Sequence, residues 1–238
     1  MLPATQVIEF DEAGIHIRGR ENKTESVFSP STPGIYSAPE YPEVISERSS
    51  QMRIVLLRHG EPDVPSPGKL KASEIPRWIE LYNAAGLKIG HRPSREAIEI
   101  ANDCNAIVCS DLPRSVESAR ALGVKKVNHI ESVFREMALP YARFPSPRLS
   151  PYMWLVLFRA LWFLGYSANG ESLHEARLRA SNGANRLTAI AEHSGSVLLV
   201  GHGITNRFIA TELLSSGWKG PGDPGKRYWE YGVYQYAI

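Results

Sequence analysis

The sequence contains little cysteine: only Cys104 and Cys109 occur among its 238 residues. The two are not spaced as Cys-x-x-Cys, and no further cysteine is present from which a disulfide framework could be built. We therefore expect both to be reduced thiols in the core of a cytoplasmic protein.

Long apolar runs are also missing. No window reaches the roughly 18 apolar residues that a membrane span requires. The first residues, Met1 to Gln6, have neither the basic start nor the apolar centre of a signal peptide. The expectation is a cytoplasmic protein with no stable membrane span.

An excess of charge of either sign is absent too. The formal net charge is +2, from 27 basic and 25 acidic residues, which gives no case for a nucleic-acid-binding surface. Apolar residues make up 43% and charged residues 22% of the chain, as in soluble globular proteins. The length suffices for one large α/β domain, or for a domain with an extension.

What the sequence does contain is a buried strand that ends in reactive side chains. Residues 54–57 form the apolar run Ile-Val-Leu-Leu, which predicts a strand covered on both faces. Arg58, His59 and Gly60 follow it. Ligands of open α/β sheets bind at the carboxyl ends of strands. An arginine fork suits phosphate or carboxylate, and histidine can serve as nucleophile, base or metal ligand.

The same arrangement recurs near the other end of the chain. Residues 196–200, Ser-Val-Leu-Leu-Val, predict a second buried strand, and Gly201, His202 and Gly203 follow. Two buried strands that both end in His-Gly indicate two imidazoles that converge on one site.

Strands and helices are expected to alternate, which predicts an α/β domain with a mostly parallel sheet. The other expected elements are a helix capped by Ser73 that ends near Gly86, a helix capped by Ser94, a strand at 106–109, a helix carrying Arg114, a strand at 124–130, a helix from Glu171 to near His193 that Gly195 ends, a helix with Ile209 and Leu213, and a closing strand at 228–237.

Residues 1–51 are expected to form an N-terminal extension, and residues 52–238 the main domain. Within the extension, residues 6–10 and 15–18 alternate in polarity around a turn with glycine, which predicts a small hairpin. The proline-rich stretch at 29–42 is expected to be an extended, mobile tether.

Residues 152–166 are apolar apart from Arg159, and Ser150-Pro151 is a good helix start. A helix that is apolar almost all round should be buried. The leading reading is therefore a core helix or the interface of a homodimer. Two alternative interpretations stay open: a lid that forms an apolar wall for the substrate, and a helix that contacts a membrane surface.

In its two strand ends and in further segments between them, the chain resembles the histidine phosphatase superfamily, also called phosphoglycerate-mutase-like. The resemblance covers about residues 52–236 and rests on segments in the family's order: Arg58-His59-Gly60, Ser110 to Ser115 with Arg114, Phe134 to Met137 with Glu136, Gly170 to Leu173 followed by Arg179, and His202-Gly203. It implies a three-layer sandwich with a mostly parallel central sheet flanked by helices.

The resemblance also implies roles for these residues. His59 would be the nucleophile and Glu136 the general acid, while Arg58, Arg114 and a cationic His202, together with Gly203, would bind the phosphate. No metal or other cofactor is implied, because the arginines stabilise the phosphoryl charge. Glu61, Ser110 and Arg207 would either border the phosphate or hold loops in place.

The function predicted from the sequence is a phosphatase that hydrolyses a phosphomonoester through a phosphohistidine on His59. Its substrate would be a small phosphorylated molecule, with an apolar group if the lid reading holds, or a phosphoprotein. Two alternatives stay open: a phosphoglycerate-type mutase, and a phosphate-binding module without catalysis. The 187 residues from 52 to 238 are few for a mutase, and binding alone would not require an acid.

Overall fold

The structure is a computed structural model that describes residues 6–11, 14–19, 51–64 and 66–237. Strands and helices alternate over most of this chain. In chain order the elements are β1 (Gln6–Asp11), β2 (Gly14–Gly19), β3 (Gln51–Arg58), the 3-10 turn η1 (Ala72–Glu74), α1 (Ile75–Ala84), α2 (Arg95–Asn102), β4 (Ala106–Cys109), α3 (Pro113–Ala121), β5 (Lys126–Ile130), the 3-10 turn η2 (Ser132–Phe134), α4 (Pro151–Phe163), α5 (Leu173–Ser194), β6 (Ser196–Gly201), α6 (Gly203–Ser215) and β7 (Tyr231–Ala237).

The strands form one sheet in the order β2-β1-β5-β4-β6-β3-β7. Strands β5, β4, β6 and β3 are parallel to one another, and β7 runs antiparallel to β3. In the parallel pair of β3 and β6, Arg58 lies opposite Gly201. His59 and His202 therefore leave the sheet at the same level, as the two His-Gly strand ends predict.

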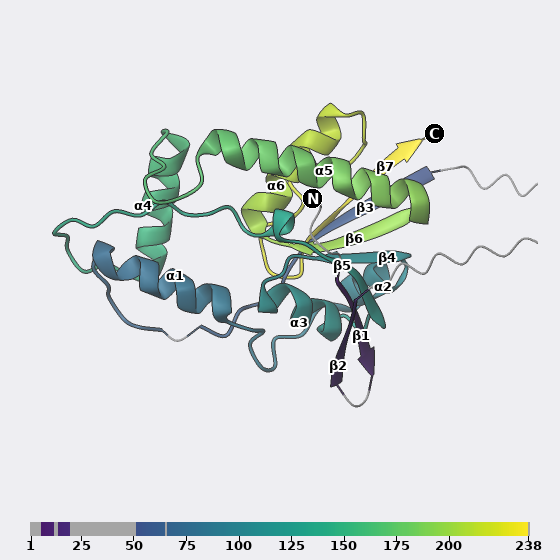
Figure 1. Ribbon diagram of the computed structural model, residues 1–238, viewed down its shortest axis with the longest axis horizontal. Coiled ribbons are helices and arrows are strands. Elements are labelled where there is room, and N and C mark those ends of the chain that lie inside the picture. The colour runs from purple at the N-terminus through teal and green to yellow at the C-terminus, as the bar shows by residue number, and fades with distance from the viewer. Residues whose placement is uncertain (1–5, 12–13, 20–50, 65, 238) are drawn as a thin grey trace, which may run out of the picture.

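The sheet is covered on both faces, which confirms the three-layer α/β sandwich (Figure 1). Alternate residues of β3 point to opposite sides: Ile54 and Leu56 pack in the cluster with α5 and α6, whereas Val55 and Leu57 pack in the cluster with α2 and α3. All four side chains are fully buried. An uninterrupted apolar strand is what such a position requires.

The hairpin of β1 and β2 extends this sheet. The two strands pair antiparallel around residues 12–13, and β1 pairs antiparallel with β5 at the sheet edge. The hairpin lies where the alternation of residues 6–10 and 15–18 predicts it. The predicted tether at 29–42 lies outside the described residues, and the division into an extension and a catalytic domain at residue 52 stays a prediction.

Local sequence features fix several helix ends. Ser94 caps α2 through a hydrogen bond from the Ala97 amide (3.2 Å), and Gly195 ends α5 with a φ of 76°. The predicted cap at Ser73 is wrong: Ser73 lies inside η1, whose N-cap is Lys71. The Glu74 carboxylate accepts a hydrogen bond from the Lys71 amide and so takes part in starting this turn.

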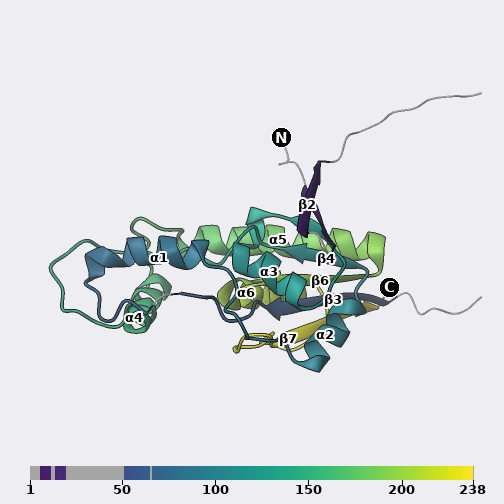
Figure 2. The same ribbon diagram turned by 90° about the horizontal axis from the view of Figure 1, so that it is seen from below.

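Helices α1 and α4 lie together beyond the carboxyl ends of the parallel strands (Figures 1 and 2). They share a small apolar cluster that includes Ile75, Trp154 and Phe158. Ser150 caps α4, as expected, through a hydrogen bond from the Met153 amide.

The expectation of a core helix is wrong for one face of α4, while the alternative of a homodimer interface stays a prediction. Trp154, Phe158 and Trp162 are buried, but the opposite face is exposed: its members include Tyr152, Met153, Val156, Leu157 and Phe163. The core accepts one side of the helix only, because α4 sits at the end of the molecule rather than between two layers. No helix in the described ranges is long and apolar enough to cross a bilayer.

Candidate active site

His59 stands at the end of β3 with a defined ring orientation. Its side chain is buried, its Nδ1 lies 2.6 Å from the carbonyl oxygen of Gly60, and its Nε2 accepts a hydrogen bond from Nε of Arg114 at 3.3 Å. A carbonyl can only accept, so the proton sits on Nδ1 and the lone pair on Nε2. Burial, helped by His202 and Arg114, lowers the pKa of His59 well below its ordinary 6.5. The imidazole is therefore neutral at pH 7, with Nε2 free to attack.

His202 occupies the N-cap position of α6, one residue after β6. Its ring centroid lies 4.9 Å from that of His59, and its Nε2 lies 2.7 Å from Oγ of Ser110. Burial, together with Arg114 and Arg58, lowers its pKa well below 6.5. Burial and the two arginines thus disfavour a positive charge on His202 itself, and the cationic His202 expected around a bound phosphate stays a prediction. A bound phosphate dianion would reverse that balance.

Arg114 lies at the start of α3 and is fully buried. Besides His59, its guanidinium donates to the Tyr82 carbonyl at 3.0 Å and reaches Oδ1 of Asn83 at 3.5 Å. It also lies over the Tyr82 ring, 4.6 Å from the centroid. Burial lowers the pKa of Arg114, but an arginine remains cationic at neutral pH. The end of α1 thus holds this cation against His59.

Arg58 lies over the ring of Tyr228, 4.6 Å from its centroid, and donates to the carbonyl of Lys226. Gly203 lies beside this guanidinium group, since a Cβ added at Gly203 would be 3.5 Å from the guanidinium carbon of Arg58. Nε of Arg58 and Nδ1 of His202 are buried and have no hydrogen-bond partner among the described residues. Buried polar nitrogens without a partner are rare, and the oxygens of an anion would satisfy both.

Glu136 reaches the same place from the segment after η2. Its Oε1 accepts hydrogen bonds from the amides of Met137 (3.0 Å) and Thr205 (3.1 Å) and from the Thr205 hydroxyl (3.2 Å). Its Oε2 lies 3.4 Å from the Ile204 amide. The carboxylate therefore rests on the first turn of α6, where free amides and the helix dipole favour an anion. Its charge acts on Arg114 and Tyr82, which places it within the same site.

Hydroxyl and amide side chains fix the segments that carry these residues. Ser118 accepts from the Gly60 amide at 2.9 Å, Ser115 donates to the Val200 carbonyl at 2.5 Å, and Asn206 donates to the Leu57 carbonyl at 3.1 Å. Each bond joins a helix to the end of β3 or β6, so the two histidines are held by both helical layers.

The structure brings together all six residues for which the sequence predicts a role: Arg58, His59, Arg114, Glu136, His202 and Gly203. Ser110 also belongs to the site through His202. Glu61 and Arg207 hold loops instead: Glu61 pairs with Lys88 and Arg207 with Asp223.

Two aromatic residues of the site were missed in the sequence. Tyr82 contacts Arg114, and Tyr228 lies 5.7 Å from His59 between ring centroids. Burial raises the pKa of Tyr82 to about 12, so its hydroxyl stays protonated at neutral pH. Neither tyrosine follows a strand or belongs to a motif; both reach the site through tertiary packing.

Among the described residues there is no group of three or more His, Cys, Asp or Glu side chains that could hold a metal ion. Cys104 and Cys109 are free thiols, as expected. Burial raises the pKa of Cys109 to about 12, so this thiol is not ionised at neutral pH and is no competing nucleophile.

Comparison with known proteins gives the family. The model of the histidine phosphatase superfamily (branch 1) matches residues 54–224, and no curated protein matches the chain significantly. Solved structures with this fold include the open reading frame Rv3214 from Mycobacterium tuberculosis, 19% identical with a TM-score of 0.51 over 76% of this chain and 90% of that one. Another is mycobacterial hydrolase 2, 20% identical with a TM-score of 0.53 over 79% and 83% of the two chains. The family model spans well over half of the sequence, and the chain therefore belongs to the histidine phosphatase superfamily, branch 1.

Proposed function

We propose that the protein is a phosphatase that hydrolyses a phosphomonoester without a metal ion, through a phosphohistidine on His59. The observation that carries this proposal is the state of the His59 ring. Its Nε2 is unprotonated, buried and directed at the guanidinium of Arg114, and a phosphate bound to that guanidinium would meet a ready nucleophile.

In the first step, the lone pair of His59 Nε2 attacks phosphorus and the bond to the ester oxygen breaks. The leaving alkoxide takes a proton from Glu136, which must first take that proton up from solvent. The negative charge of the bound phosphate favours this uptake. Arg58, Arg114 and His202 surround the three remaining phosphoryl oxygens, where charge is spread in the transition state. Binding of the dianion favours protonation of His202, since the negative charge offsets the two arginines.

In the second step, water attacks the phosphohistidine and the P–N bond breaks. Glu136, now ionised, accepts a proton from the water, and inorganic phosphate leaves with Nε2 again unprotonated. One carboxyl group thus serves as acid and then as base. Splitting the hydrolysis into two displacements is the gain that a covalent intermediate offers.

The test compares phosphate release with isomerisation. Purified protein is given 4-nitrophenyl phosphate, a panel of phosphorylated metabolites, phosphopeptides and 3-phosphoglycerate, with His59→Ala as the control for contaminating phosphatases. Release of inorganic phosphate by the wild type alone supports the proposal. Isomerisation of phosphoglycerate without release would instead indicate a mutase, and binding of phosphate without turnover a binding module.

A further inference from the structure

The segment that carries Glu136 has little regular structure of its own. It begins with η2 and then runs without helix or strand. Alternate carbonyl groups along it accept hydrogen bonds from arginines: Arg179 donates to Val133 at 2.9 Å and to Arg135 at 2.8 Å, and Arg159 donates to Met137 at 2.9 Å. Guanidinium groups thus fix the backbone on both sides of residue 136.

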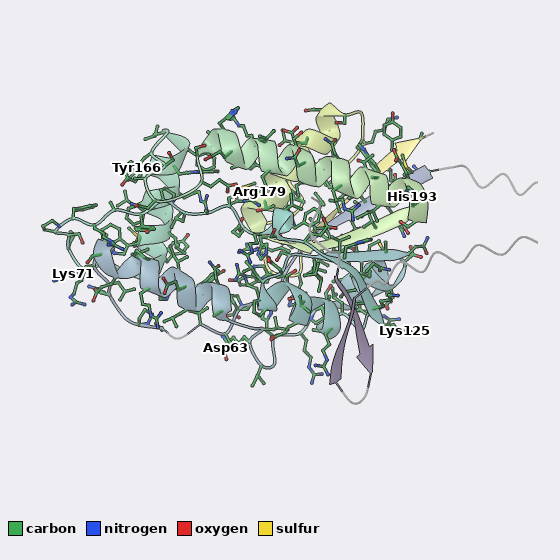
Figure 3. All side chains as sticks on the ribbon, viewed as in Figure 1. Asp63, Lys71, Lys125, Tyr166, Arg179 and His193 are labelled. Carbon is green, nitrogen blue, oxygen red and sulfur yellow. The ribbon has the colours of Figure 1, made fainter. Side chains whose placement is uncertain are left out.

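Arg179 is itself held by a carboxylate. Its Nε and Nη2 donate to Oε1 and Oε2 of Glu171 at 2.7 and 2.8 Å, which is a bidentate pair. The two side chains are 21% and 16% exposed, so water competes weakly for this pair. Glu171 also accepts from the Ala138 amide at 3.3 Å. Figure 3 shows Arg179 on the inner side of α5. The pair thus binds the segment before Glu136 through Arg179 and after it through Glu171.

We propose that Arg179, oriented by Glu171, is the positioning residue that sets where the Glu136 carboxyl meets the leaving oxygen. The inference rests on the proposed role of Glu136 as acid. The carboxylate of Glu136 receives its hydrogen bonds from Met137 and from the first turn of α6. These contacts hold only if the backbone of residue 136 stays in place relative to α6, and Arg179 joins that backbone to α5.

The chain offers a matched control on the same helix. Arg186 pairs with Glu131: its Nε and Nη2 donate to Oε1 at 3.0 and 2.8 Å, and its Nε also lies 3.3 Å from Oε2. This pair also joins α5 to the chain near η2, but its bonds to Glu131 lie outside the segment 133–138. Arg186→Lys therefore shows how the loss of an arginine–glutamate pair on α5 affects the reaction rates when the Glu136 segment keeps its contacts.

The first measurement is the single-turnover rate of alcohol release by Arg179→Lys on an alkyl phosphate and on 4-nitrophenyl phosphate. This rate reports the first step alone, in which Glu136 acts as the acid. Lysine keeps the charge but cannot bind two carbonyls and a carboxylate at once. A misplaced acid should lower this rate on the order of 10²-fold for the alkyl ester, with substrate binding little changed. The nitrophenyl ester, whose leaving group needs little protonation, should be nearly unaffected. Arg186→Lys should leave both rates unchanged.

Two further measurements separate positioning from a general loss of structure. In a Glu136→Gln background, Arg179→Lys should cause no additional loss, because both changes remove the same acid. Hydrogen exchange of residues 133–138 should become faster in Arg179→Lys and in Glu171→Gln, but not in Arg186→Lys.

Equal losses on both esters, an additive loss with Glu136→Gln, or unchanged exchange of residues 133–138 would overturn the inference. A wild type that releases no phosphate would contradict the proposed function instead. In that case the exchange measurement still decides whether Arg179 fixes the Glu136 segment.

Discussion

Nε of Arg114 lies 3.3 Å from Nε2 of His59, so the proposed nucleophile faces a buried cation. This contact contributes to two properties of the site, the second of them together with burial and His202. It directs the lone pair of His59 toward the place where a phosphate would bind Arg114, and it disfavours the imidazolium form. The neutral histidine and the arginine are thus parts of one arrangement.

The buried histidines should make stability depend on pH. The folded-state pKa values of His59 and His202 lie below 6.5. As the pH falls below about 6.5, the unfolded chain takes up protons that the folded protein does not. The free energy of unfolding should then fall with decreasing pH, by up to about 1.4 kcal/mol per pH unit for each histidine. Above about pH 6.5 this contribution is present in full.

Urea unfolding of the wild type, His59→Ala and His193→Gln between pH 5 and 7.5 checks this expectation. His59→Ala should reduce the slope of stability against pH below 6.5, because one buried titrating group is gone. His193 is exposed near the C-terminal end of α5 (Figure 3), and its replacement serves as the control for loss of a histidine outside the core. Identical slopes in all three proteins would contradict the buried, neutral state of His59.

Glu136→Gln should damage turnover according to the leaving group. Glutamine keeps an oxygen that can accept from the α6 amides, but it cannot deliver a proton. In the single-turnover rate of alcohol release, which reports the first step alone, we expect a loss of about 10²–10⁴-fold for alkyl phosphates and a much smaller loss for 4-nitrophenyl phosphate. A series of aryl phosphates of graded leaving-group pKa gives the dependence. Equal losses along the series would remove Glu136 from the acid role.

The strand ends could be predicted from the sequence, because an apolar run followed by Arg-His-Gly or Gly-His-Gly is a local pattern. The α/β class and the caps at Ser94 and Ser150 are also local. The first-turn amides of α6 beneath Glu136 could not be predicted, since their partner lies 68 residues earlier. The same holds for Tyr82 and Tyr228, which enter the site through packing of distant segments.

The exposed face of α4 shows another limit of the sequence. Composition gives the apolar content of residues 152–166, but not how many neighbours the helix has. The lowered pKa of His202 could not be predicted for a similar reason, because it follows from burial and from Arg114 and Arg58, which only the fold brings near it.

Trp162→Ala should destabilise the fold. Its ring is fully buried in the main core cluster, and its Nε1 donates to the Glu171 carbonyl at 2.6 Å. We expect a loss of about 3–5 kcal/mol in the free energy of unfolding, measured in urea. Tyr152 is 71% exposed on the other face of α4, and Tyr152→Ala should change stability by less than about 0.5 kcal/mol.

The same pair of variants tests the apolar-wall hypothesis for α4. If Trp162 only packs, the ranking of substrates should be unchanged once the variant is assayed well below its melting temperature. A raised KM for bulky phosphates with unchanged stability in Trp162→Ala would instead favour the wall.

Chelators should leave phosphatase activity unchanged. The proposed mechanism assigns the stabilisation of phosphoryl charge to Arg58, Arg114 and His202, so removal of free divalent ions should cost nothing. The measurement is phosphate release before and after prolonged dialysis against EDTA. Inactivation that a divalent ion reverses would refute the metal-independent mechanism.

The most direct test of the central claim is to trap the phosphorylated enzyme. The wild-type protein is mixed with ³²P-labelled 4-nitrophenyl phosphate and quenched within the first turnover in alkaline denaturant. Alkali preserves the acid-labile P–N bond, and the labelled residue is then identified by peptide mass spectrometry. The label should lie on His59, be lost in acid, and be absent from His59→Ala, whose turnover should fall by roughly 10⁴–10⁶-fold. A label on another residue, or turnover by His59→Ala near that of the wild type, would contradict the phosphohistidine mechanism.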